Sequence, residues 1–106
     1  MVVVLLVGAL AIGGHAAPAI HLSVQPSVAK VAERTRFVFT ATRGAHRRAV
    51  RGALVTFAGT RARTDRHGRA VIIHRFAAAG RHRARACKTG LACGQVTVRA
   101  LPYVAR

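Results

Sequence analysis

Two cysteines are the residues of this chain whose type and spacing specify a chemistry most directly. Cys87 and Cys93 flank residues 88–92, and in an oxidising compartment such a pair closes a small loop as a disulfide. A zinc site would need more ligands at tighter spacing, and His82 is the one nearby candidate. The spacing therefore predicts a disulfide that clips a hairpin, with no metal site and no cofactor.

A second group of residues that could bind a ligand is a run of arginines at alternate positions. Arg81, Arg83 and Arg85 share one side of a β-strand if their segment is extended, and Arg99 joins them if the last segment pairs beside it. No aromatic side chain is interleaved with them, so attraction to phosphates, sulfates or carboxylates is expected without base readout. We predict an anion-binding stripe for anionic polymers or an envelope surface, not for a specific nucleic acid. A merely solvated charged face is the alternative.

Catalytic constellations are missing from the sequence. Glu33 and Asp65 are the only acids, and paired-carboxylate catalysis needs two acids in one site. The six histidines are scattered, with no ligand pair at i, i+2 or i, i+4. Ser23 and Ser27 carry no nucleophile motif such as Gly-x-Ser-x-Gly. We therefore expect that the protein is not an enzyme.

The charge balance is strongly basic, with 18 Lys and Arg residues against 2 acids and a formal net charge of +16. Such an excess attracts anionic polymers or membranes and repels itself in the compact state. An Arg-rich, Lys-poor composition also arises from a GC-rich coding sequence, so composition alone does not assign a binding function.

The first nineteen residues have the order of a signal peptide. Residues 2–12 are an unbroken apolar and small run, and Ala17 and Ala19 provide the small side chains that signal peptidase accepts. The run is shorter than the ~20 residues that span a bilayer. We predict a signal peptide at 1–19, a domain at 20–106 without a transmembrane span, and a secreted or cell-envelope location. The alternative is a buried strand or helix at residues 2–12.

Past residue 20 the hydrophobic pattern has a period of two, which is typical of strands with one buried face. Val71 and Ile73 leave one strand ambiguous, because it is either covered on both faces or exposes an apolar patch. The expected strands are 20–24, 35–42, 53–58, 69–76, 81–86 and 95–101. The side chains expected to face inward are Ile20, Leu22, Val24, Phe37, Phe39, Ala41, Ala53, Val55, Phe57, Ala70, Ile72, Phe76, His82, Ala84, Ala86, Val96, Val98 and Ala100.

Roughly six or seven short strands at about ten-residue spacing, with no helix between them, predict an all-β fold. Each strand has one clearly apolar face, and these faces must be buried against another layer. The pattern therefore predicts an antiparallel β-sandwich of two packed sheets.

Three segments carry a family resemblance. Residues 50–57 read V-R-G-A-L-V-T-F, residues 64–70 read T-D-R-H-G-R-A, and residues 79–86 read A-G-R-H-R-A-R-A. Over about residues 22–101 the chain resembles the bacterial immunoglobulin-like domains of the invasin and intimin type. The resemblance implies an immunoglobulin-like sandwich and a non-catalytic structural or adhesion-type module at the cell surface. Carboxypeptidase-regulatory, transthyretin-like domains share a similar turn and are the alternative family, and a basic extracellular binder of anionic polymers is the alternative function.

The most specific piece of this resemblance is the turn that contains Thr64, Asp65 and Gly68. The Asp65 carboxylate can accept backbone N–H bonds as an Asx-turn, and Gly68 can supply the positive φ that returns the chain into the next strand. We therefore expect these three residues to have a structural role.

Overall fold

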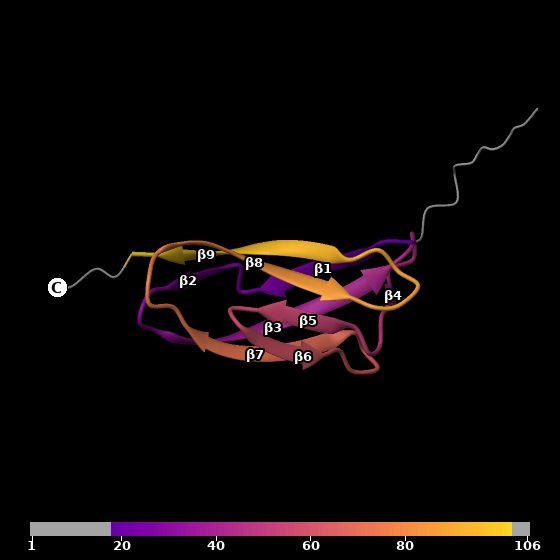
Figure 1. Cartoon of the computed structure of the whole chain (residues 1–106), viewed down its shortest axis with the longest axis horizontal. Coiled ribbons are helices and arrows are strands. Elements are labelled where there is room, and N and C mark those ends of the chain that lie inside the picture. The colour runs from indigo at the N-terminus through magenta and orange to yellow at the C-terminus, as the bar shows by residue number, and fades with distance from the viewer. Residues whose placement is uncertain (1–17, 103–106) are drawn as a thin grey trace, which may run out of the picture.

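The computed structural model describes residues 18–102, which form two β-sheets packed face to face (Figure 1). The residues predicted to form most of the signal peptide, 1–17, lie outside the described part of the chain. Within residues 18–102 no helix is long and apolar enough to cross a bilayer. The architecture is the expected all-β, immunoglobulin-like sandwich.

The first sheet is organised around β3 (Arg34–Arg43), its longest strand. One edge of β3 pairs with β1 (Ile20–Gln25), and the other edge pairs with β7 (Arg69–Arg75) and then with β4 (Arg48–Ala49). All three pairings are antiparallel. Phe37 and Phe39 are buried and alternate with less buried neighbours along β3, so their rings enter the interior.

The second sheet has the strand order β2-β9-β8-β5-β6. These strands are β2 (Val28–Lys30), β5 (Leu54–Phe57), β6 (Thr60–Arg63), β8 (Gly80–Cys87) and β9 (Gly94–Leu101). Strands β5, β6, β8 and β9 pair antiparallel, whereas β2 pairs with β9 in parallel.

The N-terminal strand region belongs to both sheets. β1 pairs with β3 in the first sheet, and after the Gln25–Pro26 peptide, which is cis, β2 pairs with β9 in the second sheet. Proline lacks the N–H that a ladder requires, so Pro26 stands where the chain leaves one sheet for the other. The chain thereby ties the two layers together along one side.

Four phenylalanines form the centre of the core between the sheets. The ring of Phe57 lies 5.2 Å from the rings of Phe37 and Phe39 and 5.8 Å from the ring of Phe76, in edge or tilted arrangements. Such geometries suit the quadrupoles of aromatic rings. With these four, small and branched aliphatic side chains complete the interior.

The expected set of inward-facing residues is confirmed. Nearly all of them are buried, and Val24, His82 and Val96 are partly buried at the margin of the core. Val71 and Ile73 are 41% and 48% exposed, so β7 is covered on one face only.

Three short strands were not predicted: β2, β4 and β6. β6 reads Thr-Arg-Ala-Arg and contains one small apolar residue, so it carries no hydrophobic alternation. It forms because Ala58 and Gly59 both adopt positive φ, of 51° and 77°, which closes a two-residue hairpin after β5. The third expected strand therefore ends at Phe57, before Ala58.

Candidate functional site

The turn between β6 and β7 carries the chain from the second sheet to the first. The Asp65 carboxylate accepts hydrogen bonds from the backbone N–H groups of His67, at 2.8 Å, and Arg69, at 3.1 Å. The bond from Arg69 does most to hold the pKa of Asp65 below its usual value, with a smaller contribution from the bond from His67. Asp65 is thus occupied as the acceptor that closes the turn.

Thr64, the residue before it, is buried at 4% exposure and holds a neighbouring loop. Its hydroxyl donates to the carbonyl of Val50 and accepts from the N–H of Ala53 at 2.9 Å. Two backbone groups of the loop before β5 are therefore satisfied by one side chain. Thr64 fastens the segment that leads into β5 to the turn that leads out of β6.

Gly68 completes the turn for two separate reasons. Its φ is +76°, in the left-handed region that other residues rarely adopt. A Cβ at this position would also lie 2.5 Å from the carbonyl oxygen of Ala41 and 3.2 Å from the backbone nitrogen of Val50. The Gly68 carbonyl accepts a hydrogen bond from the N–H of Ala41 at 2.7 Å. The turn is therefore packed directly against β3.

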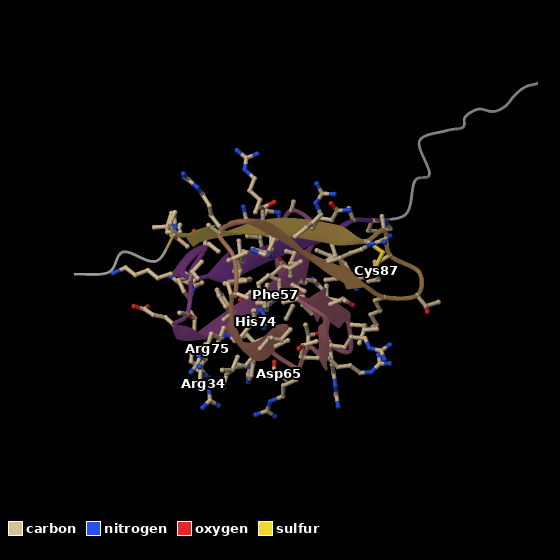
Figure 2. All side chains as sticks on the ribbon, turned by 60° about the vertical axis from the view of Figure 1, so that its left-hand side comes forward. Arg34, Phe57, Asp65, His74, Arg75 and Cys87 are labelled. Carbon is tan, nitrogen blue, oxygen red and sulfur yellow. A yellow bond between two sulfur atoms is a disulfide. The ribbon has the colours of Figure 1, made fainter. Side chains whose placement is uncertain are left out.

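The loop between β8 and β9 is closed by the expected disulfide. Cys87 and Cys93 are bonded, with Cα atoms 4.4 Å apart, at the end of β8 (Figure 2). Inside the loop the N–H of Leu91 donates to the carbonyl of Lys88 at 3.0 Å. The Lys88 ammonium group donates to the carbonyl of Arg51, which links this loop to the one before β5.

The arginine stripe lies on the outer face of the second sheet. Arg81, Arg83 and Arg85 alternate along β8 with the inward residues and are exposed. In the antiparallel register Arg99 of β9 stands directly opposite Arg81, on the same face. The structure therefore brings together the four arginines that the sequence singles out.

Three further cations share this outer face: Lys30, Arg61 and Arg63. Arg61 is opposite Thr56, which is itself opposite Arg85, and Arg63 is opposite Leu54. Sequence reasoning missed these residues because it did not recognise β2 and β6. The signal that could have found Arg61 and Arg63 is the Ala58-Gly59 pair, which permits a tight hairpin and so sends residues 60–63 back beside β5.

Two histidines pack into the aromatic core. The His82 ring is stacked on Phe76 at 4.2 Å, and the His74 ring meets the same phenylalanine edge-on at 4.8 Å. Figure 2 shows His74 beside Phe57 in the interior. The buried Nε2 atom of His82 has no hydrogen-bond partner. These imidazoles act as aromatic packing groups.

The remaining candidate groups do not converge on a reactive centre. Glu33 lies in the turn between β2 and β3, and Asp65 is engaged in its own turn. Among residues 18–102 there is no group of three His, Cys, Asp or Glu side chains that could hold a metal ion. The arginines that the sequence singles out lie instead on the exposed face of β8 and β9.

Comparison with solved structures gives a match to a chain described as the D00-D0 domain of Intimin. The TM-score is 0.57 at 15% sequence identity, and the match covers 92% of this chain and 54% of the intimin chain. The protein is thus similar in fold to about half of that intimin segment. A scan against protein-family models gives no match, and a search of curated proteins gives none either.

Proposed function

We propose that this protein is a non-catalytic, exported immunoglobulin-like module with a structural or adhesion-type role. The observation that carries the proposal is the sandwich fold, which is similar to that of an intimin segment. The resemblance of the turn at residues 64–70 to the invasin and intimin type of domain supports the same role. Fold alone does not fix function, so the proposal also depends on the arrangement of the chain ends and on the disulfide.

The arrangement of the ends suits a spacer. β1 begins at one end of the sandwich, beside the loop that holds Cys93, and β9 finishes at the opposite end (Figure 1). A module that the chain enters at one end and leaves at the other extends a surface protein by its full length. The paired strands would transmit load through many backbone hydrogen bonds along that axis.

Two features support a location outside the cytoplasm. The disulfide between Cys87 and Cys93 is a bond of oxidising compartments. The apolar run at residues 2–12 followed by Ala17 and Ala19 has the order of a cleavable export signal.

Export is the part of the proposal that an experiment decides first. The full chain with a carboxyl-terminal tag would be expressed in a bacterial host and followed by fractionation, beside a variant that carries Leu5→Arg and Leu6→Arg. We expect the parent outside the cytoplasm and the variant inside, because two charges interrupt the apolar run. A matched variant with Val71→Arg and Ile73→Arg, which adds the same charge to an exposed strand face, should still be exported. Cytoplasmic retention of the parent would contradict the proposal.

A further inference from the structure

The cations on the outer face of the second sheet form one continuous feature. Arg99 and Arg81 stand side by side on β9 and β8, and Arg83 and Arg85 continue along β8. Arg61 lies in the same cross-strand row as Arg85, with Thr56 between them. We call this feature the diagonal band, and its members are Lys30, Arg99, Arg81, Arg83, Arg85, Arg61 and Arg63.

The register makes the band run from one corner of the sheet to the other. Lys30 stands on the edge strand β2, beside Leu101, one row beyond Arg99. Arg63 stands on the opposite edge strand β6, one row beyond Arg61. With ~4.8 Å between strands and ~6.6 Å between alternate residues, the band is roughly 30 Å long. All seven side chains are exposed.

The uncharged residues that stand between the arginines of this face are polar, and the aliphatic side chains of Val28, Leu54 and Leu101 lie beside the band. Thr56, Gln95 and Thr97 fill the positions between the arginines. In the described part of the sheet, no aromatic or acidic residue belongs to this outer face. The band therefore has neither a stacking platform for bases nor internal partners that would neutralise its charge.

The other outer face of the sandwich is organised differently. There Arg34 is opposite Arg75 at one end, and Val38 is opposite Val71 further along. Figure 2 shows Arg34 and Arg75 together at one end of the molecule. Arg36 is paired across the sheet with exposed Ile73. Apolar side chains thus interrupt the cations of the first sheet, whereas no such side chain interrupts the second sheet between Arg99 and Arg85.

Like charges directly opposite each other on neighbouring strands destabilise a sheet, and Arg81 faces Arg99 in this way. A bound chain of anions removes this repulsion and releases the counterions that the band attracts. A sheet face crossed by a line of guanidinium groups fits a partner that is itself linear and regularly charged. Guanidinium forks bind carboxylate and sulfate groups with matched geometry.

We propose that the diagonal band is the binding site for a linear acidic polysaccharide that carries carboxylate or sulfate groups and lies across all five strands of the second sheet. This rests on the proposed function, since it names the partner of an exported adhesion-type module. A single-stranded nucleic acid is disfavoured because the face offers no aromatic side chain on which bases stack, and duplex DNA is one of the probes in the test.

The test compares two variants of the whole chain with the same net charge. The band variant carries Arg81→Gln, Arg83→Gln and Arg85→Gln, and the control carries Arg34→Gln, Arg36→Gln and Arg75→Gln. The probes are a heparin octasaccharide for sulfates, an oligogalacturonate of equal length for carboxylates, and a duplex DNA of similar length. Affinity is measured by calorimetry or fluorescence anisotropy over a range of salt concentrations.

We expect the band variant to lose about tenfold or more in affinity for at least one saccharide and to show a shallower salt dependence, because three contacts are removed. The control should lose no more than about threefold through the smaller general attraction. If the parent protein binds only heparin, the proposed ligand carries sulfate groups. If it binds only oligogalacturonate, the ligand carries carboxylate groups.

Equal losses in the two variants would overturn the proposal, because only the net charge would then matter. Tighter binding of duplex DNA than of either saccharide would overturn the ligand class. Circular dichroism of both variants shows whether the sandwich is intact, so that a loss is attributed to charge. Export and fold are measured separately, so failure of saccharide binding would leave the proposed module function standing.

Discussion

The two chain reversals at residues 64–69 and 88–93 connect different parts of the sandwich and are held in different ways. The first carries the chain from the second sheet to the first and is held by the Thr64 hydroxyl, the Asp65 carboxylate and the packing of Gly68 against β3. The second joins β8 to its neighbour β9 and is closed by the disulfide. A turn that crosses between the sheets needs a defined backbone conformation at each residue. The ends of a loop between paired strands are already fixed by the hydrogen bonds of those strands.

The difference explains why the first reversal is recognisable from the residue types at several positions, whereas the second is recognisable from its two cysteines alone. Each residue of the crossing turn satisfies a specific backbone group, so its residue types are restricted. Between the cysteines, residues 88–90 are exposed and Gly90 has open space where a Cβ would be. The disulfide acts there mainly by limiting the freedom of the unfolded chain.

The largest expected effect separates two glycines that both have positive φ. Gly68→Ala should lower the free energy of unfolding by about 3 kcal/mol, from left-handed strain together with the clash at the Ala41 carbonyl. Gly90→Ala should cost only about 1 kcal/mol, because it meets the strain without a clash. Urea unfolding of both variants measures the difference. Similar losses would contradict the special packing of the crossing turn.

The turn at residues 64–69 contains a buried threonine hydroxyl, whereas the threonine of the loop at residues 88–93 is exposed. Thr64→Val keeps the side-chain shape but leaves the Val50 carbonyl and the Ala53 N–H without their partner, at an expected cost of about 2 kcal/mol. Thr89→Val, in the exposed loop, should change stability by less than about 0.5 kcal/mol. Thermal unfolding compares the two. A cost at Thr89 as large as at Thr64 would remove the distinction.

The disulfide should contribute about as much to the free energy of unfolding as the Thr64 hydroxyl does, but through a covalent bond. Replacing Cys87 and Cys93 together by Ser is expected to lower the free energy of unfolding by about 2 kcal/mol, because the short loop is no longer closed in the unfolded chain. The slope of unfolding against urea should change little, since so short a loop limits the surface exposed by the unfolded chain only slightly. Unchanged stability in the double variant would show that strand pairing alone holds this loop.

The smallest effect is a pH dependence that belongs to the crossing turn. The lowered pKa of Asp65 means that its charge stabilises the folded state above the pKa of the unfolded chain, and that this stability is lost as pH falls through the lower folded pKa. Asp65→Ala should therefore destabilise the protein more at about pH 7 than at about pH 2.5. Asp65→Asn, which retains an acceptor oxygen, should fall between. Urea unfolding at both pH values checks this, and a pH-independent difference would contradict it.

The strands with clear alternation could be predicted from sequence because each must bury one face. Phe37, Phe39, Val55 and Val98 are all buried as their spacing requires. The short strands β2, β4 and β6 could not be found in this way, because hydrogen bonds to neighbours define them and their two to four residues are too few to show an alternation. Periodicity also gave no sign that β2 would leave the first sheet and pair in parallel with β9.

The candidate site shows the same division. Alternation along one strand placed Arg81, Arg83 and Arg85 on one face without knowledge of the fold. Arg61 and Arg63 join them only through the register between β5 and β6, which depends on the hairpin at Ala58. The partners of the Thr64 hydroxyl likewise lie 11 and 14 residues away in the chain, beyond the reach of local pattern.

The central claim, an exported module closed by its own disulfide, is tested most directly by the intact mass of the protein recovered from outside the cytoplasm, alkylated without reduction. We expect a chain that begins at Ile20, takes up no alkyl group, and gains two after reduction, one on each cysteine. A full-length chain that remains in the cytoplasm with both cysteines alkylated before reduction would contradict the claim.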